Sequence, residues 1–433
     1  MDGTRRGPRG GVAMPSYSAV FRTRGYLALF LAAALSTWGD YLARVVVAAF
    51  VLDKTGSPFA AAATFAVSLL PSIFGRSLLA PIADRVPYKY VLIVAHLLRA
   101  ALVGVLILAV STYQSEPGQP AAAQPLLTLF ALLFVIELVG GPAVSSSQIL
   151  MTDLFKDRRL YSRALGLGTI SEQVNQAIGL TLGGLLVAWV GAVLGLWFDL
   201  ATFLLSALVI TLVVGTEAVR GTPSAGVAGF FRDIGEGARY LFRHPVLVSL
   251  LALSLCSVWA MAAPEAVAIA YAQDQTGSTR LGGLLMAAPI FGAVVGLLMV
   301  GRWQPERQNS RIIVMALLMP LPLVMTVFAP PLPITWLLWF GCGVLQAFML
   351  PLQATFSLVV PAQMRGRVFG LGGALSVAAS GAAYLVAGYL AGKTTPAHAV
   401  AICAGVSILA IIMLGFRWPR AALSQAVKTA YDS

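Results

Sequence analysis

Charge is the scarcest property of this sequence. Only 11% of its 433 residues are Asp, Glu, Lys or Arg, whereas a soluble globular chain averages about a quarter. The remainder is strongly apolar, with 58% hydrophobic residues. These proportions exclude a soluble enzyme, a disordered scaffold and a small secreted domain. Because a bilayer-spanning helix needs about 20 apolar residues, they predict a polytopic membrane protein.

Cysteine and histidine are also scarce, and the sequence has only three of each. Cys256, Cys342 and Cys403 all lie in apolar runs, so we expect neither a disulfide framework nor a zinc site. The histidines are too scattered for a metal cluster, and no metal or other cofactor is expected. The sequence also lacks His-Glu-x-x-His and nucleophile-elbow motifs, so we do not expect a membrane enzyme.

Apolar segments long enough to cross a bilayer recur along the whole chain. None alternates as the strands of a membrane barrel do, so we expect an all-α integral membrane fold. The twelve predicted spans are Tyr26–Leu52, Ala60–Ala83, Tyr90–Val110, Leu126–Met151, Ala164–Trp189, Val193–Gly215, Val246–Ala272, Leu281–Gly301, Ile312–Ala329, Ile334–Val360, Val368–Leu390 and Ala397–Phe416.

The 29 Lys and Arg residues are distributed very unevenly about these spans. If the N-terminus is cytoplasmic, the basic residues of the outer loops are Lys54, Arg280 and Lys393. Those inside spans are Arg44, Arg76 and Arg99. All the others lie on the inner side, which fits an even number of helices with both termini cytoplasmic. Topology therefore accounts for the basic excess, and nucleic acid is not an expected partner.

A long break after the sixth span divides the chain into two predicted bundles of six helices. Residues 1–25 are expected to be a disordered basic tail, 26–215 the first bundle and 246–416 the second, with 417–433 a cytoplasmic tail. The linker, 216–245, contains an amphipathic pattern that predicts a helix lying along the inner interface. A cleaved signal peptide is not expected, and either Met1 or Met14 could be the first residue.

The loop between the second and third spans carries a recognisable motif. It reads Ala-Pro-Ile-Ala-Asp-Arg-Val-Pro-Tyr-Lys from Ala80 to Lys89. This resembles the Gly-x-Leu-Ala-Asp-Arg-x-Gly-Arg-Lys signature of the major facilitator superfamily, with Ala80 and Pro87 in place of the two glycines. The resemblance implies the major facilitator fold. It also implies that Asp84, Arg85 and Lys89 form a conformational gate at the inner ends of the bundles.

An ordered series of further stretches resembles the drug-exporting branch of the superfamily that includes macrolide efflux proteins and the enterobactin exporter. The fifth span differs from the kink motif of many antiporters, because Leu180 stands where those proteins have proline. The resembling stretches are Gly140-Gly-Pro-Ala143, Leu160…Arg163-Ala164, Gly179-Leu-Thr-Leu-Gly183-Gly184, Asp199…Thr202-Phe203-Leu-Leu-Ser206, Glu236-Gly237…Pro245 and Arg365-Gly-Arg367-Val368.

Charged residues inside the spans are candidates for proton coupling, because each costs on the order of 3 kcal/mol to place near mid-membrane. Asp40 and Arg44 are four residues apart, which puts them on one helix face and predicts an ion pair. Either Asp40 carries the proton, or it only neutralises Arg44. Glu137 has no cation within a helical turn, so it is the second proton-coupling candidate; alternatively it meets Arg44 across the bundle.

The remaining charged groups of the spans allow different readings. Glu172, with Gln173 and Gln176, belongs to a polar cluster that could line a cavity and assist coupling, or could form interhelical hydrogen bonds. Asp199 and Glu265 are expected to be interfacial, because they lie toward the outer ends of their spans. Arg99 is expected to pack against another helix, and the sequence suggests no specific role for Arg76.

Candidate substrate-binding residues are polar and aromatic groups on the spans that usually line the cavity in this superfamily. They suit a bulky amphiphile, although Trp and Tyr are also common as interface anchors. The set is Trp38, Tyr41, Gln173, Gln176, Trp259, Gln346 and Gln353.

These features favour a proton-coupled exporter of small amphiphilic compounds, such as drugs, antibiotics or siderophore-like metabolites. It would act as a monomer in the inner (plasma) membrane, with a small-molecule substrate, protons and the lipid bilayer as partners. One alternative is a facilitator or proton symporter for a polar solute, and sodium could replace the proton. An alternative of another class is a non-transporting membrane sensor or scaffold. It is disfavoured because it would not need intramembrane charges.

Overall fold

A computed structural model describes most of the chain, and every secondary-structure element in the described part is a helix. The described residues are 17–23, 25–78, 86–113, 123–155, 157–214, 226–361 and 363–419.

The N-terminal half consists of long helices that pack mainly on one another. Its elements are α1 (Tyr17–Phe21), α2 (Tyr26–Thr55), α3 (Pro58–Leu78), α5 (Tyr88–Ser111), α6 (Ala123–Leu154) and α7 (Arg158–Val213). Helix α7 contains both the fifth and the sixth predicted span. It is interrupted at Gly191, whose φ of 81° lies in the left-handed region that glycine adopts without strain. The chain therefore reverses direction there with no loop between the two spans.

The C-terminal half has more interruptions in its helices. Its elements are α8 (Gly226–Arg243), α9 (Pro245–Thr276), η1 (Thr279–Leu281), α10 (Gly282–Val300), α11 (Pro305–Ser310), α12 (Ile312–Leu318), α13 (Leu321–Val324), η2 (Met325–Phe328), α14 (Leu332–Leu345), η3 (Gln346–Phe348), α15 (Met349–Val359), α16 (Arg365–Lys393) and α17 (Pro396–Phe416). The ninth predicted span is broken at Pro320, because proline removes a backbone donor.

The described parts of all twelve predicted spans are mainly helical, but the helices differ in length and apolar character. Nine helices in the described part are long and apolar enough to cross a membrane. The other three predicted spans coincide with shorter apolar helices at 58–71, 174–187 and 312–328. The protein is therefore an all-helical, multi-pass membrane protein, and the count of twelve stays a prediction.

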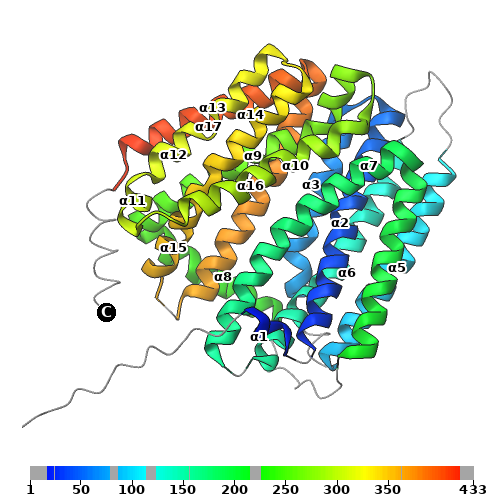
Figure 1. The fold of residues 1–433 in the computed structure, drawn as a ribbon, viewed down its shortest axis with the longest axis horizontal. Coiled ribbons are helices and arrows are strands. Elements are labelled where there is room, and N and C mark those ends of the chain that lie inside the picture. The colour runs from blue at the N-terminus through cyan, green and yellow to red at the C-terminus, as the bar shows by residue number, and fades with distance from the viewer. Residues whose placement is uncertain are drawn as a thin grey trace, which may run out of the picture.

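The two halves lie side by side, with α2–α7 on the right of Figure 1 and α9–α17 on the left. Helices α3 and α16 pack together across the boundary, as do α7 and α10. We call the end that carries the turns at Gly56, Gly191 and Gly277 the upper end, and the end that carries α1 and α8 the lower end.

Close contacts between the halves lie at the upper end. A Cβ on Gly184 of α7 would lie 2.7 Å from the Cα of Gly283 in α10, so these two backbones touch directly. In the same region a Cβ on Gly388 of α16 would lie 2.5 Å from the Cβ of Ala62 in α3. Small residues permit this approach, and they join the halves tightly where the chain turns.

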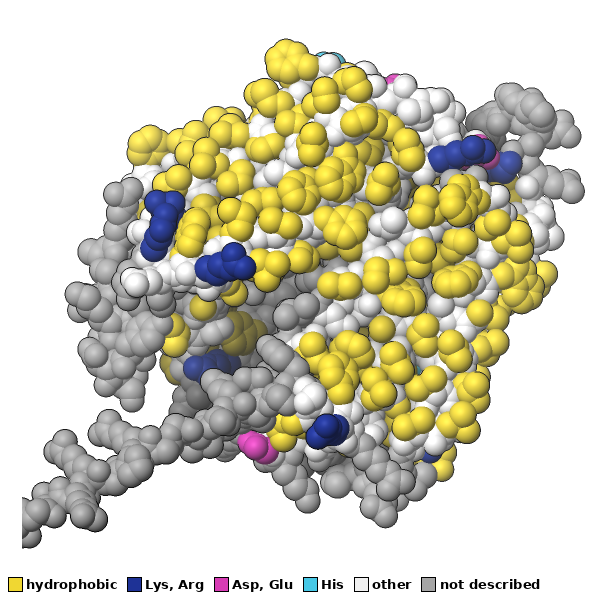
Figure 2. All heavy atoms as spheres, viewed as in Figure 1, with side chains coloured by type: hydrophobic (Ala, Val, Ile, Leu, Met, Phe, Trp, Pro, Cys, Tyr) yellow, Lys and Arg dark blue, Asp and Glu magenta, His cyan; other side chains and the backbone are white. Residues whose placement is uncertain are grey.

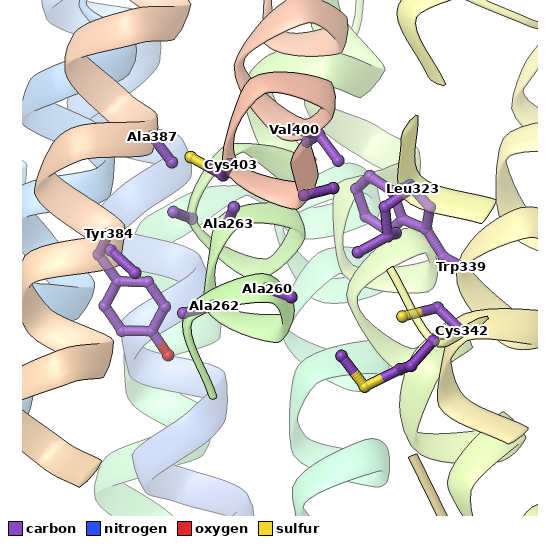
Figure 3. Close-up of a cluster of buried hydrophobic side chains, with 14 of the residues drawn as sticks. Ala260, Ala262, Ala263, Leu323, Trp339, Cys342, Tyr384, Ala387, Val400 and Cys403 are labelled. Carbon is purple, nitrogen blue, oxygen red and sulfur yellow. The ribbon is translucent and has the colours of Figure 1, made fainter. Parts of the chain in front are cut away.

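The buried apolar side chains form one large cluster and three smaller ones. The large cluster fills the C-terminal half, and its members include Trp339, Tyr384, Cys403 and Ala263 (Figure 3). It also takes in N-terminal residues, which come from the upper parts of α2, α3 and α7. The three smaller clusters contain N-terminal residues alone. Among the described residues, apolar packing between the halves is therefore concentrated at the upper end.

The outer surface carries a broad apolar belt, shown in yellow in Figure 2. Large side chains such as Trp189, Leu212 and Met413 are more than two-thirds exposed on it, at 79%, 74% and 71%. Lys and Arg side chains lie mostly toward the borders of this view. Such a belt suits contact with lipid rather than water.

Two segments outside the predicted spans can be compared with the expectations. The predicted N-terminal tail is structured from Tyr17, because Val20 of α1 is fully buried in a cluster with Tyr26 and Phe155. The linker contains helix α8 over the amphipathic stretch. Its role as a cytoplasmic linker and its location at a membrane surface stay predictions.

Candidate functional site

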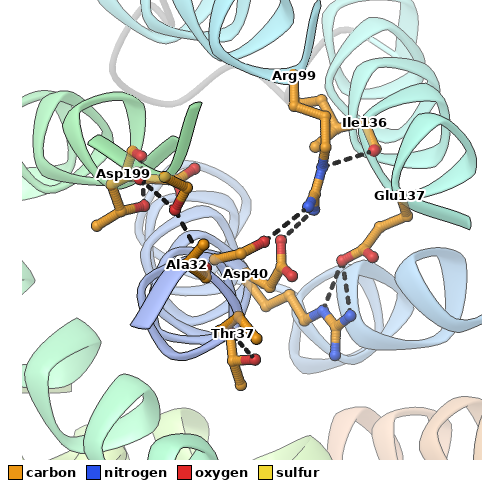
Figure 4. Close-up of polar contacts among 12 residues, drawn as sticks. Ala32, Thr37, Asp40, Arg99, Ile136, Glu137 and Asp199 are labelled. Atoms are coloured by element: carbon orange, nitrogen blue, oxygen red, sulfur yellow. Dashed lines mark hydrogen bonds and ion pairs between the residues drawn. The ribbon is translucent and has the colours of Figure 1, made fainter. Parts of the chain in front are cut away.

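The most deeply buried ion pair of the described residues joins Arg99 of α5 to Asp40 of α2. Arg99 is only 3% exposed. Its Nη2 pairs with the Asp40 carboxylate, its Nη1 donates to Ser36 Oγ at 3.1 Å, and its Nε donates to the Ile136 carbonyl at 3.1 Å (Figure 4). The guanidinium also lies over the Phe203 ring, 4.2 Å from its centroid. Arg99 thus connects four helices.

A second ion pair joins Arg44 of α2 to Glu137 of α6. Arg44 Nη2 and Nε both donate to Glu137 Oε1, at 2.6 and 2.9 Å. The two side chains are 14% and 16% exposed, whereas in the first pair the side chains of Arg99 and Asp40 are 4% and 21% exposed. The Arg44 guanidinium also lies 4.9 Å from the centroid of the Tyr41 ring. The pair is positioned by the first and fourth predicted spans.

The predicted pairing of Asp40 with Arg44 is wrong. Both side chains do project from neighbouring turns of α2, but each has its ion-pair partner on another helix. The alternative, in which Glu137 meets Arg44 across the bundle, is confirmed. The expectation that Arg99 packs on another helix is also confirmed, through Phe203 of α7. The spacing of residues along the sequence did not indicate that Arg99, rather than Arg44, is the ion-pair partner of Asp40.

Glycines permit these helices to approach closely. A Cβ on Gly140 of α6 would lie 3.2 Å from the Cζ of Arg99. The Gly-Gly-Pro-Ala stretch of the sequence therefore leaves room for the buried guanidinium. A Cβ on Gly39 would collide with Asp199 and Thr202 of α7, so glycine is also required where α2 and α7 cross.

Asp199 is not interfacial, contrary to the sequence-based expectation. It is 1% exposed, and α7 holds it against Gly39 of α2, beside the Arg99–Asp40 pair. It follows the Gly191 break by about two helical turns, which places it well inside the helix layer. Glu265 of α9 is also placed differently from the expectation, because it accepts a hydrogen bond from Tyr384 of α16 at 2.8 Å.

The polar residues of α2 and α7 meet at one further hydrogen bond. Trp38 Nε1 donates to Asn175 Oδ1 at 2.8 Å, and Asn175 in turn donates to Ser171 at 2.9 Å. Tyr41 contacts the same helix at Gly179, where an added Cβ would lie 2.8 Å from the Tyr41 Cβ. The alternative of interhelical hydrogen bonding is thus observed through Asn175.

The remaining members of the predicted polar cluster differ in exposure. Glu172 is exposed and Gln176 is half-buried. The side chain of Gln173, like that of Arg76, lies outside the described part. Among the candidates of the C-terminal half, Trp259 and Gln346 are half-buried, whereas Gln353 is exposed.

The predicted gate is only partly described. Asp84 and Arg85 lie outside the described residues. Lys89 of α5 donates to the carbonyl of Thr211 near the end of α7, at 3.0 Å. A cation at a helix C-terminus is favourable, and this contact lies within the N-terminal half.

These groups form one polar layer that extends to the boundary between the halves. Arg44 acts electrostatically on both Glu137 in its own half and Glu265 in the other. The layer contains ionisable groups, aromatic faces and amides, with no chemistry for covalent catalysis among the described residues. It can bind a solute and exchange protons, which are the tasks of a membrane transporter.

The comparisons with known proteins agree with this class. The sequence profile of the family described as Major Facilitator Superfamily matches residues 29–371. The chain therefore belongs to the major facilitator superfamily and is a transporter, not an enzyme.

Its relatives include a multidrug efflux protein. The chain is 27% identical over 408 residues to multidrug efflux pump Tap of Mycobacterium tuberculosis, covering 92% of this chain and 94% of that protein. It is 25% identical over 300 residues to the MFS-type transporter YfmI of Bacillus subtilis, covering 67% and 70%. Among solved structures, a mutant of peptide transporter POT matches with a TM-score of 0.67 and 14% identity, over 96% of this chain and 97% of that one. At that identity the match concerns the fold alone.

Proposed function

We propose that this protein is a proton-coupled exporter of small amphiphilic compounds. The observation that carries the proposal is the similarity to multidrug efflux pump Tap over nearly the whole chain. The buried ion pairs support the coupling part of the proposal, because a purely apolar core would have been less costly to build. The protein would reside as a monomer in the inner (plasma) membrane, with twelve spans in two six-helix bundles and both termini cytoplasmic.

The distribution of contacts supports alternating access between the halves. The positive-inside pattern assigns the lower end to the cytoplasm. The Gly184–Gly283 contact and the shared apolar cluster then lie toward the outside. In this conformation the two halves would therefore be closed against each other at the outer face. Rocking of the halves would separate the two glycines and open the cavity outward.

Substrate would bind between the halves, near the middle of the helices. Trp38, Tyr41 and Trp259 offer aromatic faces, and Gln176 and Gln346 offer amides. All five are half-buried, as expected of residues that border a cavity. Exposed Gln353 and Glu172 would act only at the cavity mouth, and Gln173 stays a candidate from the sequence alone.

Proton coupling would involve Asp40 and Glu137, each through its arginine. Protonation of Glu137 would remove the charge that holds Arg44, and Arg44 could then turn toward Glu265 across the boundary. Since Glu265 belongs to the other half, this exchange would connect a protonation event to the relative position of the halves. Asp84, Arg85 and Lys89 would stabilise the closed cytoplasmic state in the same cycle.

The test is transport by the purified protein in liposomes under imposed pH gradients, with a chemically diverse panel of fluorescent amphiphiles. In vesicles that hold the protein inside-out, an acidic lumen should drive amphiphiles inward as protons leave. The accumulation should fall in Arg44→Gln, which keeps a polar side chain but removes the charge. Loss of polar solutes from the acidic lumen, with no movement of amphiphiles, would favour the symporter. Sodium-dependent transport without pH dependence would refute proton coupling.

A further inference from the structure

Asp199 is a buried acid that the coupling scheme above does not use. Both carboxyl oxygens are buried and have no hydrogen-bond partner among the described residues. This is unusual, because polar groups inside proteins are nearly always hydrogen-bonded. An ionised carboxylate in such a position costs much more free energy than a neutral carboxyl group.

The neighbouring donors are already engaged elsewhere. The Thr202 hydroxyl donates to the backbone carbonyl of Asp199 at 2.7 Å, not to its carboxylate. The Ser206 hydroxyl donates to the carbonyls of Ala32 and Thr202, at 3.1 and 2.8 Å. Glycine at position 39 has no side chain, so α2 has no side-chain donor at the point where it meets the Asp199 carboxylate.

The charges of the described side chains around Asp199 also do not balance. Among those described in the N-terminal part of the polar layer, the two cations are Arg44 and Arg99, and each is paired with an acid. Asp199 is a third acid without a cation of its own among the described residues. Asp40, Arg99 and Glu137 all act on it electrostatically, and two of these repel a negative charge.

One further titratable group lies near Arg99. His96 of α5 is 4% exposed, and its ring centroid lies 6.1 Å from that of Phe203, the ring that Arg99 covers. Its Nδ1 has no hydrogen-bond partner among the described residues. The described charged groups that act on Asp199 itself are Asp40 on α2, Arg99 on α5 and Glu137 on α6.

We propose that Asp199 is a proton-binding site of this transporter. In the present conformation its carboxyl group is closed off from water and holds the proton. When a movement of the helices admits water to it from the cytoplasmic side, the O–H bond breaks, the proton passes to water and a carboxylate remains. That carboxylate competes with Asp40 for Arg99, so proton release loosens the contact between α2 and α5. The proposal rests on the proton-coupled function, but proton binding can be measured without transport.

Infrared difference spectroscopy of the purified protein between acid and alkaline pH tests the site directly. We expect a protonated carboxyl band in the wild type that is absent in Asp199→Asn, because asparagine copies the shape of the neutral acid. The control is Asp274→Asn, at an exposed residue of α9, which should keep the band. In Asp40→Asn the band should weaken at neutral pH, since Arg99 then lacks its partner and attracts the Asp199 carboxylate. Persistence of the whole band in Asp199→Asn would overturn the proposal.

A second measurement uses the wild type alone, in case Asp199→Asn does not fold. Dicyclohexylcarbodiimide reacts with protonated carboxyl groups in apolar surroundings, and mass spectrometry of peptides locates the adduct. We expect the adduct on Asp199 and not on Asp40 or Glu137. Reaction at either of those acids instead, or at none of the three, would overturn the proposal.

Transport measurements distinguish a failure of this inference from a failure of the proposed function on which it rests. In Asp199→Asn, transport driven by a pH gradient should fall about tenfold or more, while substrate counterflow stays within about twofold of the wild type. Full pH-driven transport in Asp199→Asn refutes the role of Asp199 only. Absence of pH-driven transport in the wild type refutes the proposed function, and the spectroscopic band then still decides whether Asp199 binds a proton.

Discussion

The two halves of this transporter have very different interiors. In the N-terminal half, Asp40, Arg99, His96, Asn175 and Asp199 lie among the apolar side chains. The buried polar residues of the C-terminal half are hydroxyls, and several of them donate to carbonyls one turn earlier in their own helices. Its buried apolar residues belong to one continuous cluster, part of which Figure 3 shows, whereas those of the N-terminal half are divided between that cluster and three smaller ones.

This difference shows how the two tasks of a transporter are divided. Apolar burial is the main source of stability, and the C-terminal half has it without interruption. Buried charges contribute little net stability, and they leave a large penalty when one partner is removed. We therefore expect substitutions that replace a charged or polar residue with an uncharged one to destabilise the protein more in the N-terminal half than in the C-terminal half.

The largest effect is expected from Arg99→Met. It removes the partner of buried Asp40 and the contact with Phe203, and should destabilise the protein by about 3–5 kcal/mol. Thermal unfolding of the detergent-purified protein measures the loss. The double variant Asp40→Leu with Arg99→Met should recover most of it, whereas Arg280→Met, at an exposed residue, should have no effect. A double variant no more stable than Arg99→Met would contradict this pairing.

A matched pair of substitutions compares the halves directly. Glu137→Gln leaves Arg44 without a carboxylate and should cost about 2 kcal/mol. Glu265→Gln keeps an oxygen that can accept from Tyr384, so it should cost less than about 0.5 kcal/mol. The same unfolding measurement applies to both. Equal losses of stability in the two variants would contradict the expected difference between the halves.

The contact between the halves can be weakened with one methyl group. In Gly283→Ala the new Cβ meets the Leu180 carbonyl and Gly184, which should disfavour the present conformation by about 1–2 kcal/mol. Spin labels at positions 57 and 394, in a background without the native cysteines, report the separation at the upper end. We expect a longer distance. Gly341→Ala is the control because nothing lies within 4 Å of its Cβ, and an equal shift there would rule out the steric explanation.

The smallest effect is expected at the linker helix. Glu236 of α8 pairs with Arg367 of α16 at 2.5 Å, but the two side chains are 39% and 33% exposed. Water and salt screen such a pair, so Glu236→Gln should cost at most about 1 kcal/mol. Unfolding at low and high salt measures it, and the difference from wild type should shrink as salt is added. A difference that grows with salt would indicate that charge is not the cause.

The sequence predicted the helices well because apolar length and helix formation are local properties. Even the helix at 226–243 followed from a local pattern. Ion-pair partners are not local. The spacing of Asp40 and Arg44 obeys the i,i+4 rule, yet α5 and α6 supply partners that no spacing within α2 could indicate. Asp199 was misplaced for the same reason, since its surroundings depend on Gly39 in a different helix.

The order of the paired residues along the chain has a consequence for biosynthesis. When α2 first enters the bilayer during synthesis, Asp40 and Arg44 have only each other, one turn apart, and their mutual neutralisation lowers the cost of insertion. Helix α5 later delivers Arg99, and α6 delivers Glu137. The Asp40–Arg99 pair can therefore form once α5 has been inserted, and the Arg44–Glu137 pair only after α6. The short-range pair of α2 belongs to the nascent chain, and folding in the membrane includes an exchange of partners between four charged side chains.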